Sequence, residues 1–250
     1  MSESTSDHYD RLAASYDENW AAHSEAFNRW MSERILERLD LQADDRVVDL
    51  GCGTGIFSKA LNTQAREVVC ADPSSSMLAQ LPTTSGLLVP VHASAEQVAS
   101  RGVRLPYDHV DAILIKEALH HVHHRETVIA GLARLLAPGG RMLVVTLPTV
   151  ISYPLFRRAL EVFTEHQPDP ADVVAAMRAA GLAVTVTDDT YRRQIAKDRY
   201  IAMVRDRHMS LLSKFDDAEL ENGISEIERE HPEQVLEFDD RFVFVLGRHP

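Results

Sequence analysis

Hydrophobic and polar positions follow two successive patterns along the chain. Over residues 1–45 apolar side chains recur three and four positions apart, as at Phe27, Met31 and Ile35, which predicts amphipathic N-terminal helices. From residue 46 the pattern changes, and short apolar runs alternate with helical segments. These runs, which we interpret as strands, occupy 46–50, 67–71, 87–91, 110–115 and 141–147.

The segments between the runs, such as 54–63, 75–81 and 124–136, have helical patterns. Strands that alternate with helices predict a parallel sheet covered on both faces. The sequence APGG at 137–140 is typical of a helix end followed by a turn, which places the fifth strand after it.

The last hundred residues add helices at 154–165 and 169–180 and strands at 183–187 and 241–246. We therefore expect an α/β fold, a Rossmann-like, seven-stranded, mostly parallel sheet with helices on both faces. A helix-rich insertion at about 190–235 is interpreted as a lid over the carboxyl edge of the sheet, where such folds bind ligands. The chain is predicted to form one domain over 1–250: a helical cap (1–45), a core (46–150) and C-terminal strands with the lid (151–250).

Composition excludes several classes of protein. A net charge of −12 disfavours nucleic acid as a partner, because phosphate contacts need a basic surface. No apolar run reaches the ~18 residues that span a membrane, and the acidic N-terminus MSESTSDHYD is unlike a secretory signal. Cys52 and Cys70 do not suggest a disulfide framework and favour a reducing compartment. We expect a cytoplasmic protein without a membrane partner, and the oligomeric state stays open.

The run VVDLGCGTG at 47–55 predicts a buried strand, a glycine turn and a helix N-terminus, an arrangement that binds nucleotide-like ligands. A dinucleotide fingerprint requires a third glycine where Ile56 stands. Asp49 at the end of the strand would repel a pyrophosphate and attract a cation. We expect S-adenosylmethionine as the ligand, because it is a nucleoside that carries an ammonium and no phosphate. The alternative is that the glycines only shape a tight turn.

The chain resembles the class I S-adenosylmethionine-dependent methyltransferases, especially the small-molecule branch that includes quinone-biosynthesis and natural-product enzymes. The resemblance is strong over 7–147 and extends to the remainder only in outline. The segments that carry it are YDRLAASYD at 9–17, VVDLGCGTG at 47–55, VVCADPSSSML at 68–78, DAILIKEALHHV at 111–122 and LARLLAPGGRMLVV at 132–145.

The resemblance implies S-adenosylmethionine as the cofactor and a role for each part of its site. The loop of Gly51, Cys52, Gly53 and Gly55 would line the methionine part, with Asp49 close to the ammonium. Asp72 would accept hydrogen bonds from the ribose hydroxyls, and Pro73 and Met77 would flank the adenine. Ser94, Ala95 and Glu96 would contact the adenine amine, and Lys116 would direct its carbonyl at the ammonium.

Some of these positions have alternative interpretations. Ser94 stands where the family usually has an acid, so its contact would be weaker or made by the backbone. Asp72 is also a suitable N-cap for the following helix. Pro73 and Met77 are equally consistent with packing residues, and Cys52 with a core residue that has no redox role.

Candidate catalytic residues follow the fourth strand. Some relatives carry a similar Glu-x-x-His-His stretch, here Glu117 to His121, and use a histidine there as a base. His120 or His121 is therefore predicted to take the acceptor's proton. The alternative is that the histidines only form hydrogen bonds that stabilise the fold. His120 and His124 would share a helical face, but the motif offers no carboxylate or thiol partner, and we predict no metal.

Tyr9 and Tyr16 belong to the N-terminal helix that closes over the cofactor in relatives. Tyr16 is predicted to place its ring near the sulfonium, where an aromatic face attracts a cation. Their seven-residue spacing also fits an aromatic stripe that faces the core.

The lid carries an unusual charge pattern. Between Tyr191 and Lys214 there are seven cationic residues against two acids, whereas 216–240 contains eleven acids against Arg229 alone. The cations could receive an anionic acceptor. Because most charge runs are solvated faces, we favour the alternative that they pair with the neighbouring acids.

We therefore predict transfer of a methyl group to a small molecule, at a hydroxyl or carboxylate oxygen, in secondary metabolism such as natural-product biosynthesis. The alternatives are methylation at nitrogen or carbon, or an S-adenosylmethionine-binding protein with a non-methylating or regulatory role. Methylation of protein or nucleic acid is disfavoured, because KEAL stands after the fourth strand in place of an Asn/Asp-Pro-Pro-aromatic motif.

Overall fold

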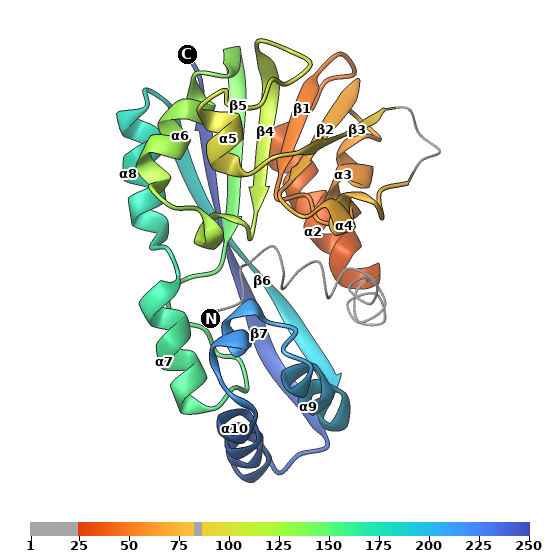
Figure 1. Cartoon of the computed structure of the whole chain (residues 1–250), viewed down its shortest axis with the longest axis vertical. Coiled ribbons are helices and arrows are strands. Elements are labelled where there is room, and N and C mark those ends of the chain that lie inside the picture. Colours follow the sequence, from red (N-terminus) through yellow and green to blue (C-terminus); the bar gives the residue numbers. More distant parts are fainter. Residues whose placement is uncertain (1–24, 83–86) are drawn as a thin grey trace. The chain divides into compact units, whose positions relative to one another are not determined.

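The computed structural model describes residues 25–82 and 87–250 (Figure 1). The chain divides into two compact units. Unit 1 comprises Met1–Thr146, Asp169–Thr187 and Val243–Pro250, and unit 2 comprises Leu147–Pro168 and Asp188–Phe242. The segment predicted to form a lid lies in unit 2, together with the helix that follows the fifth strand. The single-domain organisation therefore stays a prediction.

A seven-stranded sheet has the order β3-β2-β1-β4-β5-β7-β6. Strands β1 to β5 are parallel where neighbours pair, and β7 pairs antiparallel with β5. This confirms the predicted fold class. The strands are β1 (Arg46–Leu50), β2 (Glu67–Asp72), β3 (Leu88–His92), β4 (Val110–Lys116), β5 (Leu136–Thr146), β6 (Ala183–Ala196) and β7 (Val235–Arg248).

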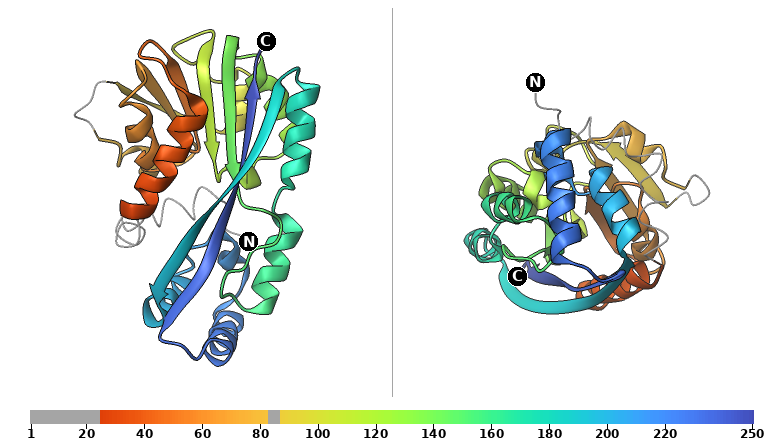
Figure 2. Two further views of the ribbon diagram at one scale, coloured as in Figure 1. Left: turned by 180° about the vertical axis from the view of Figure 1, so that it is seen from behind. Right: turned by 90° about the horizontal axis from the view of Figure 1, so that it is seen from below.

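Helices of unit 1 lie on both faces of the sheet (Figures 1 and 2). One group packs with β2, β3 and β5, and the other shares the main hydrophobic core with β1, β4 and β5. The first group is α2 (Glu25–Leu39), α3 (Ile56–Leu61) and α4 (Ser75–Leu78). The second group is α5 (Ala95–Ala99), α6 (Arg125–Ala133) and α8 (Pro170–Ala179).

Strand β1 has the sequence RVVDL and is buried from its second residue onward. Such an apolar run is expected for a central parallel strand that is covered on both faces. Its register aligns Asp49 with Cys70 of β2 and with Leu114 of β4. The carboxyl ends of β1 and β4 consequently lie side by side, and the segments that follow them meet at one edge of the sheet.

Strand β5 begins earlier than its sequence predicts. The APGG segment at 137–140 lies inside the strand, and pairing with β4 shifts from Val110↔Leu136 to Ala112↔Arg141. Gly139 adopts a φ of +76°, which a residue without a side chain tolerates. The turn sequence thus forms an irregularity within a continuous strand.

Unit 2 contains α7 (Arg157–His166), α9 (Lys197–Arg205), the 3₁₀ helix η2 (Ser210–Lys214) and α10 (Asp217–Glu230). It also contains one end of β6 and one end of β7, and its buried side chains form a core of its own. Large members of the unit 2 core are Phe156, Tyr200, Ile201, Leu212, Phe215, Ile224 and Phe238.

Throughout 25–82 and 87–250, no helix has the length and apolar character needed to cross a bilayer.

Candidate functional site

The glycine turn at 51–55 joins β1 to α3. Gly51, Gly53 and Gly55 all have positive φ, at +70°, +55° and +81°. A Cβ built on Gly51 would lie 2.4 Å from the Cβ of Ala118, so only glycine allows the turn to approach the segment after β4 this closely. A Cβ on Gly53 would meet nothing within 4 Å. The turn is therefore packed against protein at Gly51 and has open space at Gly53.

Asp72 closes the other side of the turn from the end of β2. Its Oδ2 accepts a hydrogen bond from the Gly53 N–H (2.9 Å) and its Oδ1 accepts one from the Ser74 N–H (2.8 Å). Each carboxylate oxygen has a second lone pair, so the group fits the predicted role of accepting ribose hydroxyls. The N-cap of α4 is Ser74, whose Oγ accepts the Met77 N–H. The interpretation of Asp72 as that N-cap is therefore wrong.

Asp49 lies in β1, two residues before the glycine turn, and is 3% exposed. Its Oδ2 accepts a hydrogen bond of 2.5 Å from the Ser58 hydroxyl of α3. Burial and the charge of Asp72 raise the pKa of Asp49 to about 6, against the hydrogen bond from Ser58 and the charge of Lys116, which lower it. Because the carboxylate is destabilised by burial, a cation bound nearby would stabilise it.

The residues predicted to contact the adenine lie in two segments, one at the start of α4 and the other at the start of α5. Pro73 is exposed and Met77 is buried. Ser94 forms a capping box with Gln97 at the start of α5, directly before Ala95. Glu96 accepts the His123 N–H at 3.0 Å, and although burial opposes it, hydrogen bonds lower the pKa of Glu96. The contacts of these side chains with adenine stay predictions.

Cys52 is partly buried within the glycine turn, and its backbone N–H donates to Ala71 at 3.3 Å. The neighbouring Cys70 and burial raise the pKa of the Cys52 thiol. A protonated thiol is a poor nucleophile. These features support the interpretation of Cys52 as a residue without a redox role.

Lys116 is the last residue of β4, and its side chain makes contacts that the sequence did not predict. Its Nζ forms an ion pair with the carboxylate of Glu117 and lies 5.0 Å from the ring centroid of Phe57 and 5.8 Å from that of Phe27. Glu117 has a φ of +49°, which is uncommon for a residue with a side chain. The prediction concerned only the carbonyl of Lys116, and no sequence pattern indicated that its ammonium would lie near the two rings.

His120 and His121 lie in the short 3₁₀ helix η1 (Leu119–His121), with ring centroids 3.9 Å apart. Burial, together with the charges of Arg125 and Lys116, lowers the pKa of His120 to about 4. A neutral imidazole of this kind is able to accept a proton at neutral pH.

His124 is exposed and has a φ of +50° at the N-cap of α6, so it does not share a helical face with His120. In the part of the chain that the structure describes, no group of three or more His, Cys, Asp and Glu is arranged to hold a metal.

Tyr9 and Tyr16 lie outside the described residues. The catalytic role predicted for Tyr16, and the cofactor contacts predicted for both, stay predictions.

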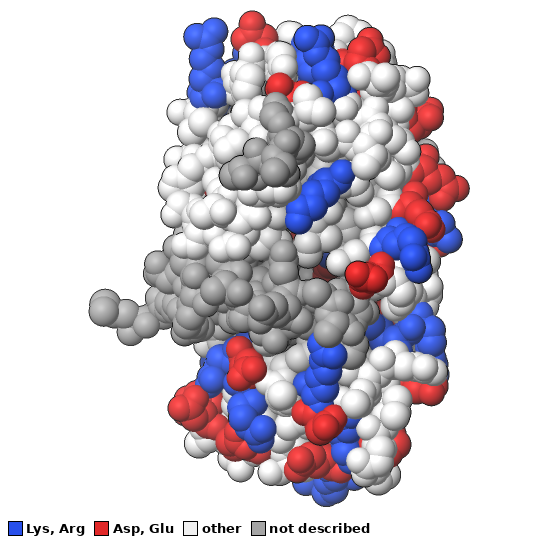
Figure 3. Space-filling model, turned by 90° about the vertical axis from the view of Figure 1, so that its right-hand side faces the viewer, with Lys and Arg blue, Asp and Glu red and all other residues white. Residues whose placement is uncertain are grey.

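The cations predicted on the lid belong to unit 2, where many contact carboxylates. Figure 3 shows basic and acidic side chains interspersed on this part of the surface. This is the arrangement expected if the charges form surface pairs. The pairs are Arg192 with Glu237 and Asp239, Arg193 with Asp240, Arg205 with Glu221 and Arg207 with Asp217.

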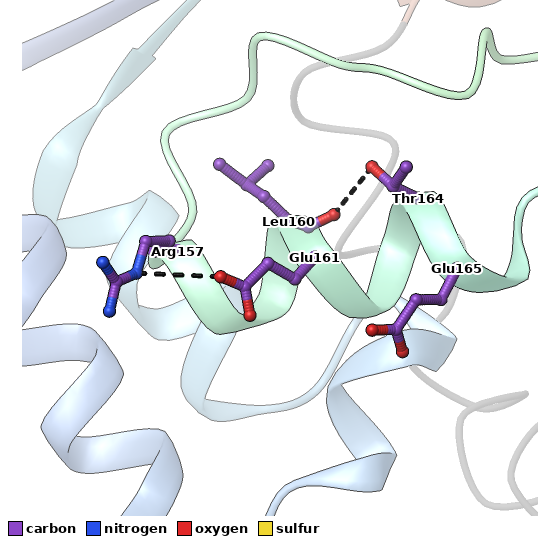
Figure 4. Close-up of a pocket in the computed structure, with 5 residues that line it drawn as sticks. All are labelled: Arg157, Leu160, Glu161, Thr164 and Glu165. Atoms are coloured by element: carbon purple, nitrogen blue, oxygen red, sulfur yellow. Dashed lines mark hydrogen bonds and ion pairs between the residues drawn. The ribbon is translucent and has the colours of Figure 1, made fainter.

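A hollow of about 410 Å³ lies along α7 in unit 2 (Figure 4). Arg157, Leu160, Glu161, Thr164 and Glu165 line it, and Arg157 forms a long ion pair of 3.8 Å with Glu161. No predicted site residue is among them, and the glycine turn remains the candidate site.

Comparison with known proteins identifies the family of the chain. Residues 48–144 match the family model described as a methyltransferase domain. The chain is 31% identical over 192 residues to a ubiquinone biosynthesis O-methyltransferase of Xylella fastidiosa, covering 69% of this chain and 76% of the relative. It is 32% identical over 139 residues to a ubiquinone/menaquinone biosynthesis C-methyltransferase of Pseudomonas fluorescens, covering 54% of each.

A solved phosphoethanolamine N-methyltransferase of Haemonchus contortus, in complex with S-adenosylhomocysteine, has a TM-score of 0.63. It is 15% identical and covers 99% of this chain and 60% of that one, so it shows the fold alone.

The chain belongs to the class I S-adenosylmethionine-dependent methyltransferases, and its cofactor is S-adenosylmethionine. Within that class it is similar to enzymes that act on small molecules. It spans about half the length of the Pseudomonas relative and about three quarters of the Xylella relative.

Proposed function

We propose that this protein transfers a methyl group from S-adenosylmethionine to a hydroxyl oxygen of a small aromatic acceptor of the quinone-precursor type. The observation that carries the proposal is the juxtaposition of an open glycine turn with a neutral histidine. Gly51 of the turn packs against Ala118, two residues before His120. This arrangement would bring ligand and base to the same edge of the sheet.

The residues around the turn would hold the cofactor by complementary chemistry. Asp72 would accept hydroxyl hydrogen bonds, Gly53 leaves room for close approach, and Asp49 supplies negative charge. When bound, S-adenosylmethionine supplies a methyl group activated by its sulfonium. The protein then has to orient the acceptor and remove its proton.

His120 is suited to accept that proton at a ring nitrogen. Its low pKa keeps the imidazole neutral, because burial and the cations Arg125 and Lys116 disfavour the charged form. The charge of Arg125, the larger of the two that act on His120, would also stabilise negative charge that develops on an acceptor oxygen. This stabilisation would offset the weakness of His120 as a base.

The acceptor class is supported by the relatives. The O-methyltransferase match extends over 192 residues, beyond the cofactor-binding core, whereas the C-methyltransferase match extends over 139. We favour oxygen for this reason. An anionic acceptor is not required, since Arg192, Arg193 and Arg205 have carboxylate partners.

The test is to incubate the purified protein with S-adenosylmethionine and a panel of catechols, hydroquinones and naphthoquinols, and to measure S-adenosylhomocysteine. Product mass and NMR would separate O-methylation from C-methylation. Methyl groups found only on carbon would refute transfer to oxygen. Binding of the cofactor without turnover of any acceptor would favour the non-methylating alternative.

A further inference from the structure

The side chain of Lys116 occupies an unusual position for a cation. It is only 15% exposed, lies over the rings of Phe57 and Phe27, and pairs with the adjacent Glu117. Lys116 is in register with Val145 of β5, and Glu117 donates its N–H to the same residue. The backbone makes this strand pairing, which therefore does not depend on the Lys116 side chain. Burial of an ammonium also has a free-energy cost.

The location of Lys116 relates it to the glycine turn. Ile115 pairs with Leu50 of β1, so Lys116 lies level with Gly51, the first residue of the turn. Lys116 is also close enough to affect the ionisation of both Asp49 and His120. The ammonium is thus placed where the amino-acid part of the cofactor would lie.

Charge complementarity identifies a ligand group for this ammonium. The amino-acid part of S-adenosylmethionine carries one ammonium and one carboxylate. Asp49 and Glu117 offer negative charge to the first, and Lys116 offers positive charge to the second. On the basis of the proposed function, we propose that Lys116 binds the carboxylate of the cofactor, and that Glu117 positions Lys116 for this contact.

The backbone at Glu117 supports this assignment. A left-handed conformation at a residue with a side chain is strained, and such residues cluster at functional sites. Here it directs the Glu117 carboxylate back toward Lys116. The strain would be unnecessary if the pair were an ordinary surface contact.

The experiment compares two nucleosides by calorimetry. One is S-adenosylhomocysteine, and the other is 5′-(3-aminopropylthio)-5′-deoxyadenosine, which keeps the ammonium and lacks the carboxylate. Lys116→Met should weaken binding of the first by about 10- to 100-fold and leave the second unchanged. Lys116→Arg should retain the preference for the carboxylate. The matched control is Lys59→Met, an exposed cation on α3, which should change neither affinity.

The proposal would be overturned if Lys116→Met lost affinity for both nucleosides equally, or lost no affinity for S-adenosylhomocysteine. If the wild-type protein bound neither nucleoside, cofactor binding itself would fail, which distinguishes the two proposals. Should Lys116→Met not fold by circular dichroism, Lys116→Gln gives the same comparison with a polar side chain of similar length.

Discussion

The hydroxyl of Ser58 donates a 2.5 Å hydrogen bond to the carboxylate of Asp49. This contact joins the first turns of α3 to the end of β1, on either side of the glycine turn. It partly compensates the burial that raises the pKa of Asp49 to about 6. The site therefore holds a carboxylate that changes its charge close to neutral pH.

Asp49→Asn should stabilise the protein without cofactor at high pH. The pKa of Asp49 is about 6 in the folded protein against 3.8 ordinarily, so the folded state retains a proton that the unfolded chain releases. Stability from this group consequently falls as pH rises from about 4 to 6 and stays low above it, by up to about 3 kcal/mol. In thermal unfolding, the gain in Tm for Asp49→Asn should be larger at pH 8 than at pH 5.

The control for that measurement is Asp44→Asn, at an exposed carboxylate before β1, which should show no such pH dependence. A gain of equal size at both pH values would contradict the assignment to the buried carboxylate.

Cofactor affinity should rise with pH through about 6. A cationic ligand favours the charged form of Asp49, so binding below pH 6 has to release its proton. Calorimetry in buffers of different ionisation enthalpy would measure the released proton. For Asp49→Asn the affinity should be lower and nearly independent of pH between 5 and 8. An equally steep dependence in that variant would assign the proton to another group.

His120→Ala should lower kcat by about 10²- to 10⁴-fold and leave the Kd of the cofactor nearly unchanged. The pKa of His120 is lowered to about 4, so the wild-type base is deprotonated throughout pH 5–8, and kcat should not fall in that range through its titration. His121→Ala tests the second histidine, and exposed His124→Ala serves as the control. Full turnover by both His120→Ala and His121→Ala would exclude a histidine base.

Gly51→Ala and Gly53→Ala should separate folding from binding. Both positions have positive φ, but only at Gly51 would the new methyl collide with Ala118. We expect Gly51→Ala to lose several kcal/mol of unfolding free energy, whereas Gly53→Ala should lose about 1 kcal/mol and bind the cofactor at least tenfold more weakly. Chemical denaturation and calorimetry measure the two effects. A Gly53→Ala protein with full affinity would show that the open space is not used by the ligand.

Two tyrosines of unit 2 provide a matched pair for stability. The Tyr153 hydroxyl donates to the buried carboxylate of Asp240, whereas the buried Tyr200 hydroxyl has no partner in the described part of the chain. Tyr153→Phe should lower the free energy of unfolding by about 1–3 kcal/mol, and Tyr200→Phe should leave it unchanged or raise it by about 1 kcal/mol. Urea denaturation measures both, and a large loss in Tyr200→Phe would reveal a partner for its hydroxyl.

Sequence patterns predicted the position of each strand of the sheet because central parallel strands are continuous apolar runs, as in VVDL before Gly51. They also predicted that Asp49, Asp72 and His120 lie at one edge of the sheet, since residues at the carboxyl ends of parallel strands meet there. The ends of β6 and β7 were less predictable. Exposed alternating residues in unit 2 extend both strands well beyond their apolar segments.

Contacts between distant side chains could not be predicted. Arg141 stands in an apolar run, yet it is buried and donates to the carbonyl of Leu39 and to the carboxylate of Asp45. Likewise, the pairing of Lys116 with Glu117 depends on a left-handed backbone that no local motif indicated. Such contacts depend on three-dimensional placement and not on periodicity.

The chain passes from one unit to the other after Thr146, Pro168, Thr187 and Phe242. Unit 2 is thus built from two separate stretches of sequence, and its second stretch is bounded by strands that continue into the sheet. A chimera that imports this unit from a relative would have to exchange both stretches together and preserve the alternation of β6 and β7 at the two junctions of the second stretch.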